Sequence, residues 1–333
     1  MTPPLPARRH EIDAPGPDAR LALREVAVPP PGPGEARIRT TRIGVNFVDV
    51  YHLRGVYPLP ALPGAPGVEA TGEVEALGPG VRGLEIGDRV AVVAGAPGAY
   101  ATARTLPAAR LARMPDGLDP ARVAGAALRA LTARMLLTRL RPVGPGDAVL
   151  ITAAAGGLGG ALAALARARG ALTIGTAGSP AKAETARAHG LDHVLVGRGA
   201  ALAARLPDAV RDLTGGEGAS LAVDGVGGPM LAACLAALRP FGVCASVGQA
   251  AGAPPAPALS ELTNRGLHRP SVIAWLADPD RFRAEAEAWF ADLLADPDGP
   301  GAADVAVHRF EEAPTLLAAL EAGETSGPLA LVP

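Results

Sequence analysis

A glycine-rich joint between an apolar run and an alanine-rich run is the first stretch of this sequence that could do chemistry. Residues 149–170 read VLITAAAGGLGGALAALARARG, with the spacing Ala153-x-x-Gly156-x-x-Gly159 and further glycines interleaved. Small residues let the backbone approach a pyrophosphate, and the N-terminal N–H groups of a following helix favour negative charge. The alternative is a tight turn that is glycine-rich for packing alone. Because a predicted strand precedes the joint and a predicted helix follows it, we expect a dinucleotide site.

The end of the next predicted strand indicates which dinucleotide binds. NAD-binding proteins usually place an Asp or Glu there, which accepts a hydrogen bond from the ribose 2′-hydroxyl. This chain instead reads IGTAGSPAK, with no acid before Glu184 and with Ser179 and Lys182 near the start of a helix. Lys182 is the only lysine of the chain, and this group suits a 2′-phosphate. A lysine exposed on a helix surface is the alternative, but the pattern favours NADP.

Several other kinds of site have no motif in the sequence. P-loop, H-E-x-x-H, C-x-x-C and G-x-S-x-G patterns do not occur, which argues against a nucleotide triphosphatase, a zinc protease and a serine hydrolase. His189 and His193 flank a helix-to-strand joint, so we expect both at the surface. Cys234 and Cys244 are the only cysteines; they exclude a disulfide framework and favour a reducing cytoplasm.

Alternating strands and helices must position the glycine-rich joint. From about residue 146, short apolar runs bounded by glycine alternate with helical patterns, which predicts a doubly wound parallel sheet. The first part of the chain, up to about residue 120, is dense in Gly and Pro between short β-type runs, which is typical of an irregular barrel or rolled sheet. The last part mixes helices and strands, and we expect it to pack on the first part.

Composition narrows the class of protein and of partner. The 333 residues suffice for two domains, 49% are hydrophobic, 19% are charged, and the net charge is −2. No basic field would attract nucleic acid or an acidic membrane. No apolar run reaches the roughly 18 residues of a spanning helix, and the N-terminus does not read as a signal peptide. We therefore expect a cytoplasmic protein with neither a nucleic-acid nor a membrane partner.

From about residue 20 to its end, the chain resembles the medium-chain dehydrogenase/reductase superfamily, and within it the zinc-independent quinone oxidoreductases related to zeta-crystallin. The motifs that carry the resemblance are GVNFVDVYHLRGVYP, PGVEATGEVEALGPGV, GDRV, AAAGGLGG, GTAGSPAK, RPS at 269–271 and SGPLALVP. Asn46 stands where the zinc alcohol dehydrogenases of the superfamily have a zinc-binding cysteine, and Val68 replaces the histidine of their G-H-E. Their four-cysteine lobe is missing. A catalytic zinc needs about three protein ligands, so we expect no metal site.

The resemblance implies that side chains polarise the substrate in place of zinc. The implied catalytic residues are Asn46, Tyr51 and Tyr57. We expect Asn46 to donate a hydrogen bond to a carbonyl oxygen as negative charge develops on it. Tyr57 would shape the pocket and is a candidate proton donor, whereas Asp49 would orient its neighbours. His52 would place a titratable group near the substrate. The alternative for the tyrosines is a structural role in a loop.

The resemblance also implies a set of coenzyme-binding residues: Thr132, Ala155, Gly156, Gly157, Leu158, Gly159, Ser179, Lys182, Arg198 and Gly248. Two positions depart from the family. Gly197 stands where the family often has a tyrosine near the adenosine 2′-phosphate, and we expect Arg198 to supply part of that contact. Arg129 replaces a lysine expected just before Thr132.

The predicted fold class is α/β, with a Rossmann doubly wound parallel sheet inserted in a GroES-like β-barrel domain. Residues 1–123 and 262–333 would form the catalytic domain and residues 124–261 the NADP-binding domain, with the active site in the cleft between them. The implied function is zinc-independent, NADPH-dependent reduction of quinones or α,β-unsaturated carbonyls. One alternative is an enoyl-thioester or natural-product enone reductase, and another is a non-catalytic, crystallin-like NADPH-binding protein. The family also implies a homodimer, with edge pairing near SVIAW (271–275) as a hypothesis.

Overall fold

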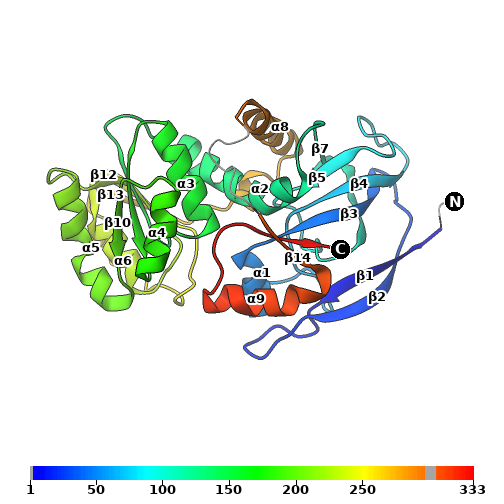
Figure 1. Ribbon diagram of the computed structural model, residues 1–333, viewed down its shortest axis with the longest axis horizontal. Coiled ribbons are helices and arrows are strands. Elements are labelled where there is room, and N and C mark those ends of the chain that lie inside the picture. The colour runs from blue at the N-terminus through cyan, green and yellow to red at the C-terminus, as the bar shows by residue number, and fades with distance from the viewer. Residues whose placement is uncertain (1–2, 297–304) are drawn as a thin grey trace. The chain divides into compact units, whose positions relative to one another are not determined.

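The computed structural model describes residues 3–296 and 305–333, and these form two compact units. The first unit contains residues 3–128, 273–296 and 305–333, and the second contains residues 129–272. The blue N-terminal segment and the red C-terminal segment of Figure 1 therefore belong to the same unit.

A mixed sheet forms the centre of the first unit. Its strands lie in the order β14 (Ala306–Arg309), β15 (Leu329–Val332), β3 (Glu35–Val45), β4 (Ala70–Leu77), β5 (Arg89–Val92) and β7 (Ala112–Arg113), and β6 (Ala103–Pro107) also pairs with β3. β14 and β15 are parallel, whereas the other pairs are antiparallel. The register of β3 with β4 shifts twice, and such irregularities bend a sheet. A separate antiparallel hairpin contains β1 (Leu5–Glu11) and β2 (Ala22–Val28).

Two helices of the first unit have a recognisable capping residue, α8 (Pro279–Ala295) at its start and α9 (Ala313–Ala322) at its end. The unit also contains α1 (Phe47–Leu53) and the short 3₁₀ helices η1 (Ala108–Arg110) and η4 (Phe310–Glu312). At the start of α8, the Asp278 carboxylate accepts a 2.7 Å hydrogen bond from the Arg281 N–H, and Pro279 takes the first helical position. α9 ends at Gly323, whose φ of 69° is left-handed. Ile43, Tyr100 and Phe310 lie fully buried in the core between α1, α9 and the sheet.

The second unit is built on a six-stranded parallel sheet. Its strands lie in the order β10 (His193–Val196), β9 (Leu172–Ala177), β8 (Ala148–Ile151), β11 (Ala219–Asp224), β12 (Leu238–Ser246) and β13 (Arg265–His268). Every pairing is parallel. Counted along the chain, this is the order 3-2-1-4-5-6 of the Rossmann fold, and the strand order reverses between β8 and β11. The predicted doubly wound sheet is therefore confirmed.

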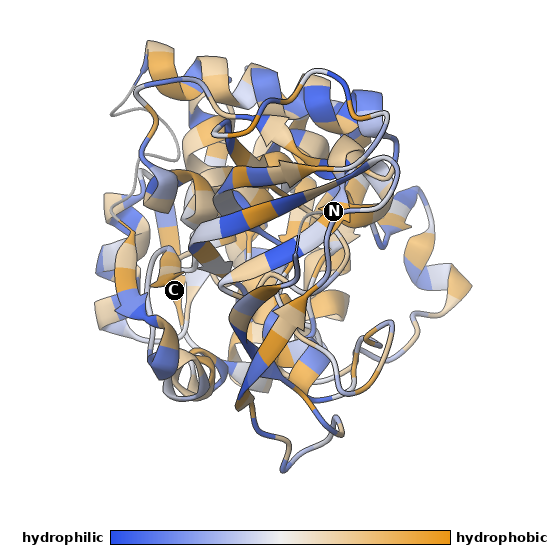
Figure 2. Ribbon diagram, turned by 90° about the vertical axis from the view of Figure 1, so that its right-hand side faces the viewer, coloured by the Kyte–Doolittle hydropathy of each residue, from blue (hydrophilic) through white to orange (hydrophobic). Residues whose placement is uncertain are grey.

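Helices connect these parallel strands, as the alternating sequence pattern predicts. They are α3 (Gly157–Ala168), α4 (Pro180–Ala188), α5 (Gly199–Leu213), α6 (Pro229–Ala236) and η3 (Leu259–Leu262). α2 (Pro120–Met135) and the π-helical turn η2 (Leu136–Leu140) precede β8. Figure 2 shows hydrophilic and hydrophobic segments alternating along the helices, as expected of helices with one face on a core.

The central strands of the second unit are buried along their whole length. Each residue of β8 and of β11 is buried. β8 accordingly reads as an unbroken apolar run, whereas β11 also buries Ser220 and, at its end, Asp224. Leu150 packs in one core cluster with Leu206 and Val210 of α5, and all three are fully buried. Truncating a leucine at such a position typically costs about 2–5 kcal/mol.

The stretch near which two copies were expected to pair lies directly after the last strand of the parallel sheet. Val272–Trp275 forms the short helix α7, and β13 is the edge strand on that side of the sheet. Pairing of two copies at a sheet edge near residues 271–275 stays a hypothesis. Pro270 directly precedes this stretch, and proline lacks the N–H that continued ladder pairing needs. In the described parts of the chain, no helix is both long enough and apolar enough to cross a membrane.

Candidate active site

The glycine-rich joint lies at the carboxyl edge of the parallel sheet, where the strand order reverses. It connects β8 to α3, and Gly156 is the N-cap of that helix. Glycine has no side chain, and no side-chain hydrogen bond caps α3. The first-turn N–H groups of Gly157, Leu158 and Gly159 have no intrahelical acceptor, and together with the helix dipole they form a site for a phosphate group.

The joint is tight because its backbone folds back on itself. Ala153 has a left-handed φ of 50°, and its carbonyl accepts a 2.9 Å hydrogen bond from the Gly156 N–H. A left-handed conformation costs a non-glycine residue about 1–2 kcal/mol. A Cβ at Gly159 would lie 2.6 Å from the Ala154 carbonyl oxygen and 2.8 Å from that of Ala153. Only glycine fits at position 159 without moving the loop.

His189 supports this loop, which the sequence did not indicate. Its Nδ1 lies 3.2 Å from the Ala154 carbonyl oxygen, and its ring would lie 2.9 Å from a Cβ at Gly160. The prediction that His189 and His193 are surface residues is wrong, because both are half-buried. His189 follows α4 as its C-cap residue, and only the packing of α4 beside the loop brings the ring there.

Three of the predicted coenzyme residues converge at the ends of β9 and β10. The Ser179 hydroxyl caps α4 by accepting a 3.3 Å hydrogen bond from the Lys182 N–H. The Arg198 Nε donates a 2.8 Å hydrogen bond to the Gly178 carbonyl. The Gly197 N–H donates to the Ala177 carbonyl at 2.9 Å and ties the two strand ends together. This corner contains a hydroxyl and two cationic side chains, and residues 172–183 carry no carboxylate.

The ends of β11 and β12 add a buried carboxylate that the sequence did not single out. Asp224 is fully buried and accepts hydrogen bonds from the Thr152 hydroxyl at 3.1 Å and from the Val226 N–H at 3.0 Å. Burial raises the pKa of the Asp224 carboxyl, and these hydrogen bonds oppose the rise. The Gly248 N–H, predicted to lie at the coenzyme, donates to the Asp224 carbonyl at 3.2 Å. Asp224 therefore holds the loops that follow β8, β11 and β12, at the place where the strand order of the sheet reverses.

Arg129 lies against the first turn of α3. Its Cδ would be 2.6 Å from a Cβ placed on Gly157, so the glycine leaves room for the arginine stem. Thr132, one helical turn later in α2, is half-buried. The departure from lysine at position 129 thus keeps a cation beside the phosphate-binding turn.

In the first unit, Asn46 is held from two sides at the start of α1. Its backbone N–H donates to the Asp49 carboxylate at 2.9 Å, and its side-chain Nδ2 donates to Glu69 Oε1 at 2.6 Å. The Asn46 side chain makes no cap hydrogen bond to the helix, although asparagine is a preferred N-cap residue. The sequence analysis did not single out Glu69, which appears there only as part of the motif PGVEATG.

Asp49 lies within a polar network closed from solvent. It is fully buried and accepts a 3.1 Å hydrogen bond from the Tyr100 hydroxyl. Burial raises the pKa of the Asp49 carboxyl to about 7, and the hydrogen bonds from Asn46 and Tyr100 oppose the rise. Burial and the adjacent Asp49 raise the pKa of Tyr100 well above its ordinary value. Asp49 is thus poised between its neutral and charged forms near neutral pH.

Tyr51 and Tyr57 lie together at the end of α1. Their rings make an edge contact with centroids 5.1 Å apart, because the chain turns and the Tyr57 N–H donates to the Tyr51 carbonyl at 3.2 Å. Tyr51 is buried and Tyr57 is half-buried. Burial lowers the pKa of the adjacent His52 to about 4, so this imidazole is neutral at pH 7. Within the described residues, no group of three or more His, Cys, Asp or Glu could hold a metal ion.

Known proteins match most of the chain. Residues 32–116 match the family described as alcohol dehydrogenase GroES-like domain, and residues 157–291 match the family described as zinc-binding dehydrogenase. A 2-haloacrylate reductase from Burkholderia is 40% identical over 79% of this chain and 80% of that protein. A quinone oxidoreductase from Pseudomonas aeruginosa is 35% identical over 85% of this chain and 87% of that protein. The crystal structure of Escherichia coli quinone oxidoreductase complexed with NADPH superposes with a TM-score of 0.90 at 29% identity, covering 98% of this chain and 100% of that one.

Proposed function

This chain belongs to the quinone oxidoreductase family of the medium-chain dehydrogenase/reductases, and from that premise we propose how its residues carry out the reaction. The protein is an oxidoreductase that uses NADPH to reduce quinones or unsaturated compounds. The roles of individual residues follow from the geometry of each unit.

One observation carries the assignment of coenzyme-binding residues: the corner made by Ser179, Lys182 and Arg198. The Ser179 hydroxyl and the Arg198 guanidinium lie at the ends of adjacent strands, and Lys182 follows in the first turn of α4. Positive charge and hydroxyl donors fit a 2′-phosphate, whereas a free 2′-hydroxyl would be matched by a carboxylate. The uncapped start of α3 fits the pyrophosphate. These residues would hold NADPH, which supplies the hydride.

The substrate end of the site would be Asn46 with the tyrosine pair. One N–H of the Asn46 carboxamide is used by Glu69, and an amide nitrogen carries two. We assign the second N–H to a substrate oxygen on which negative charge develops. Tyr57 keeps part of its ring exposed beside the buried Tyr51, so it would form the pocket wall and is the candidate proton donor.

A substrate panel tests this proposal. Loss of NADPH absorbance is measured with menadione, cyclohexenone and crotonyl-CoA, for the wild type and for Asn46→Ala. We expect turnover of menadione or cyclohexenone, and a kcat about 100-fold lower in Asn46→Ala, as for other lost donors to a developing oxyanion. Faster turnover of crotonyl-CoA would favour the enoyl-thioester alternative. Tight NADPH binding without turnover of any of the three would favour a non-catalytic role.

Reduction of an activated carbon–carbon double bond is a second candidate reaction. Its support is the 40% identity to a 2-haloacrylate reductase, whose name states an unsaturated substrate. Competition between menadione and cyclohexenone at equal concentration would rank the two by kcat/KM.

We also propose that the protein works in the cytoplasm as a homodimer on small-molecule substrates. Both cysteines are buried and free, in keeping with a reducing compartment. Light scattering tests the oligomeric state, and a monomer at micromolar concentration would contradict the homodimer.

A further inference from the structure

Glu69 is a fully buried carboxylate that connects the start of α1 with α2. Its Oε1 accepts a 2.6 Å hydrogen bond from Asn46 Nδ2, and its Oε2 accepts a 2.6 Å hydrogen bond from the Leu128 backbone N–H in α2. Both oxygens act as acceptors, as expected of an ionised carboxylate. Short bonds to a charged acceptor are about twice as strong as neutral ones.

The backbone at Gly44 passes close to the Glu69 side chain. The Gly44 N–H donates to the Glu69 carbonyl at 3.2 Å. A Cβ on Gly44 would lie 2.3 Å from Glu69 Oε1 and 2.0 Å from the Ala124 carbonyl oxygen. Glycine at position 44 therefore makes the room in which the carboxylate reaches Asn46.

The bond to Glu69 decides how the Asn46 carboxamide is oriented. An amide can present either its oxygen or its nitrogen to a neighbour, but only the nitrogen can donate to the Glu69 carboxylate. The Asn46 side chain makes no cap hydrogen bond at the start of α1, where asparagine commonly caps; the Asp49 N–H donates to the Asn46 backbone carbonyl instead. The Asp49 carboxylate holds the Asn46 backbone at the same time. Asn46 is thus fixed at its main chain and at its side chain by different carboxylates.

We propose that Glu69 is a positioning residue for the reduction step, which orients the Asn46 carboxamide so that its second N–H faces the substrate oxygen. The inference rests on the proposed donor role of Asn46. A donor fixed in advance stabilises developing charge without reorganisation during the reaction, and a displacement of about 1 Å can cost about 100-fold in rate.

Steady-state kinetics of Glu69→Gln tests the proposal. Glutamine has one oxygen, so it can accept from Asn46 or from Leu128 but not from both. We expect kcat to fall about 10- to 100-fold, with the KM for NADPH unchanged because the coenzyme-binding residues lie in the second unit. The matched control is Glu75→Gln on β4, the strand that begins directly after Glu69; the Glu75 carboxylate pairs with Arg37 at 3.3 Å. That variant should lose stability and keep the wild-type kcat.

A double variant separates positioning from general destabilisation. If Glu69 acts through Asn46, then Asn46→Ala combined with Glu69→Gln will be no slower than Asn46→Ala alone. If the losses of kcat in the two single variants multiply in the double variant, the proposal is overturned. A normal kcat in Glu69→Gln together with a low kcat in Asn46→Ala would overturn it while leaving the donor role of Asn46 intact. A normal kcat in Asn46→Ala would overturn both.

A spectroscopic readout on the wild type covers the case in which Glu69→Gln does not fold. The side-chain amide signals of Asn46 are assigned by their loss in Asn46→Asp. We expect one Nδ2 proton to be shifted downfield and to exchange slowly with solvent, because it bonds to a buried carboxylate. Two fast-exchanging Nδ2 protons at the chemical shifts of a solvent-exposed asparagine would overturn the proposal.

Discussion

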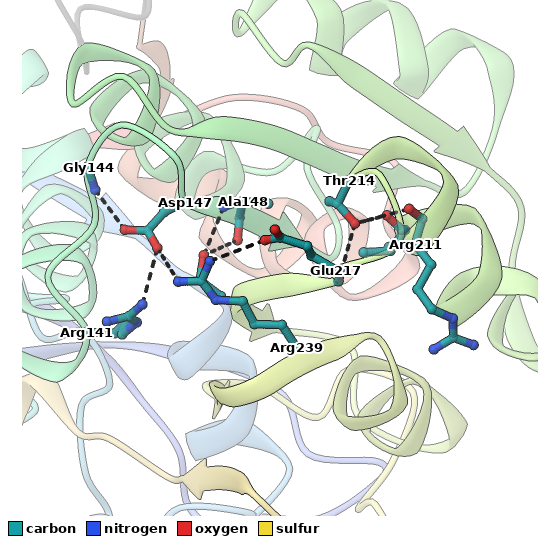
Figure 3. Close-up of polar contacts among 11 residues, drawn as sticks. Arg141, Gly144, Asp147, Ala148, Arg211, Thr214, Glu217 and Arg239 are labelled. Carbon is teal, nitrogen blue, oxygen red and sulfur yellow. Dashed lines mark hydrogen bonds and ion pairs between the residues drawn. The ribbon is translucent and has the colours of Figure 1, made fainter.

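The strands of the parallel sheet in the second unit begin at one edge, the amino edge, and end at the other, the carboxyl edge. Charged side chains have different partners at these two edges. At the amino edge, Asp147 precedes β8 and receives hydrogen bonds from Arg141 at 3.2 Å and from Arg239 at 2.9 Å (Figure 3). Its other oxygen accepts a 3.0 Å hydrogen bond from the Gly144 N–H. Every polar atom of this carboxylate has a protein partner, and its charge is balanced within the fold.

At the carboxyl edge, the corner formed by the ends of β9 and β10 presents cations and N–H groups, and the acidic residue of this edge, Asp224, lies at the end of β11. The start of α3 has no side-chain cap. Arg198 and Lys182 flank Gly178 and Ser179 with no carboxylate in residues 172–183. Paired charge at one edge fixes the connections between strands, whereas we propose that the cations at the other edge bind the phosphate of a coenzyme. On this proposal, the difference separates structural residues from coenzyme-binding residues on one sheet.

The largest expected effect comes from adding a methyl group at the carboxyl edge. In Gly159→Ala the new Cβ would lie 2.6 Å from a backbone oxygen of the joint, so the loop must move away from the pyrophosphate. We expect NADPH to bind more than about 100-fold more weakly, or about 2.7 kcal/mol, as measured by fluorescence titration. Gly144→Ala is the control at the amino edge, where a Cβ meets nothing within 4 Å. Equal affinities in both variants would remove the distinction between the edges.

Removal of the single lysine should change coenzyme preference. In Lys182→Ala we expect the Kd for NADPH to rise about 10- to 50-fold through loss of a charge-assisted bond to the 2′-phosphate. The Kd for NADH should stay the same. Arg187→Ala is the control on the same helix, because its cation already pairs with Glu184 at 2.5 Å. An equal loss of affinity for both coenzymes would argue against a 2′-phosphate contact.

Asp49 in the first unit differs from Asp147, because no hydrogen bond or ion pair among the described residues joins its buried carboxylate to a cation. Its pKa is about 7 in the folded chain and about 3.9 in an unfolded one. Between these values the folded chain keeps a proton that the unfolded chain has released, so the free energy of unfolding falls as pH rises from about 4 to 7. In Asp49→Asn we expect the free energy of unfolding to fall less steeply over this pH range, by up to about 1.4 kcal/mol per pH unit. Denaturant unfolding over this pH range measures the slope, and an unchanged slope would contradict the raised pKa.

The smallest effect is expected for the paired charge at the amino edge. Asp147→Asn removes the anion that Arg141 and Arg239 share, but these side chains are partly exposed, with 31% and 26% of their surface accessible. Screening by water limits the loss of stability to about 1 kcal/mol. NADPH affinity should stay at the wild-type value. A changed affinity for NADPH in Asp147→Asn, together with a wild-type free energy of unfolding, would contradict the roles assigned to the two edges.

Features encoded within about 20 neighbouring residues could be predicted from the sequence. The order of the second unit follows from alternating strands and helices, and α4 begins where Ser179 and Pro180 indicate a cap. His189 was misjudged, because its ring reaches the Ala154 carbonyl only through the packing of α4 beside the glycine-rich joint.

The sequence by itself determined the class of fold, the phosphate-binding turn and the absence of an acid after the second strand of the parallel sheet. Each of these depends on neighbouring residues and on local backbone geometry. Only the tertiary structure decided that Glu69 meets Asn46. The antiparallel register of β3 and β4 places Ile43 opposite Ala70, and this pairing brings together side chains 23 residues apart. Hydrogen bonds of that kind depend on sheet register and burial, which no local pattern of residues specifies.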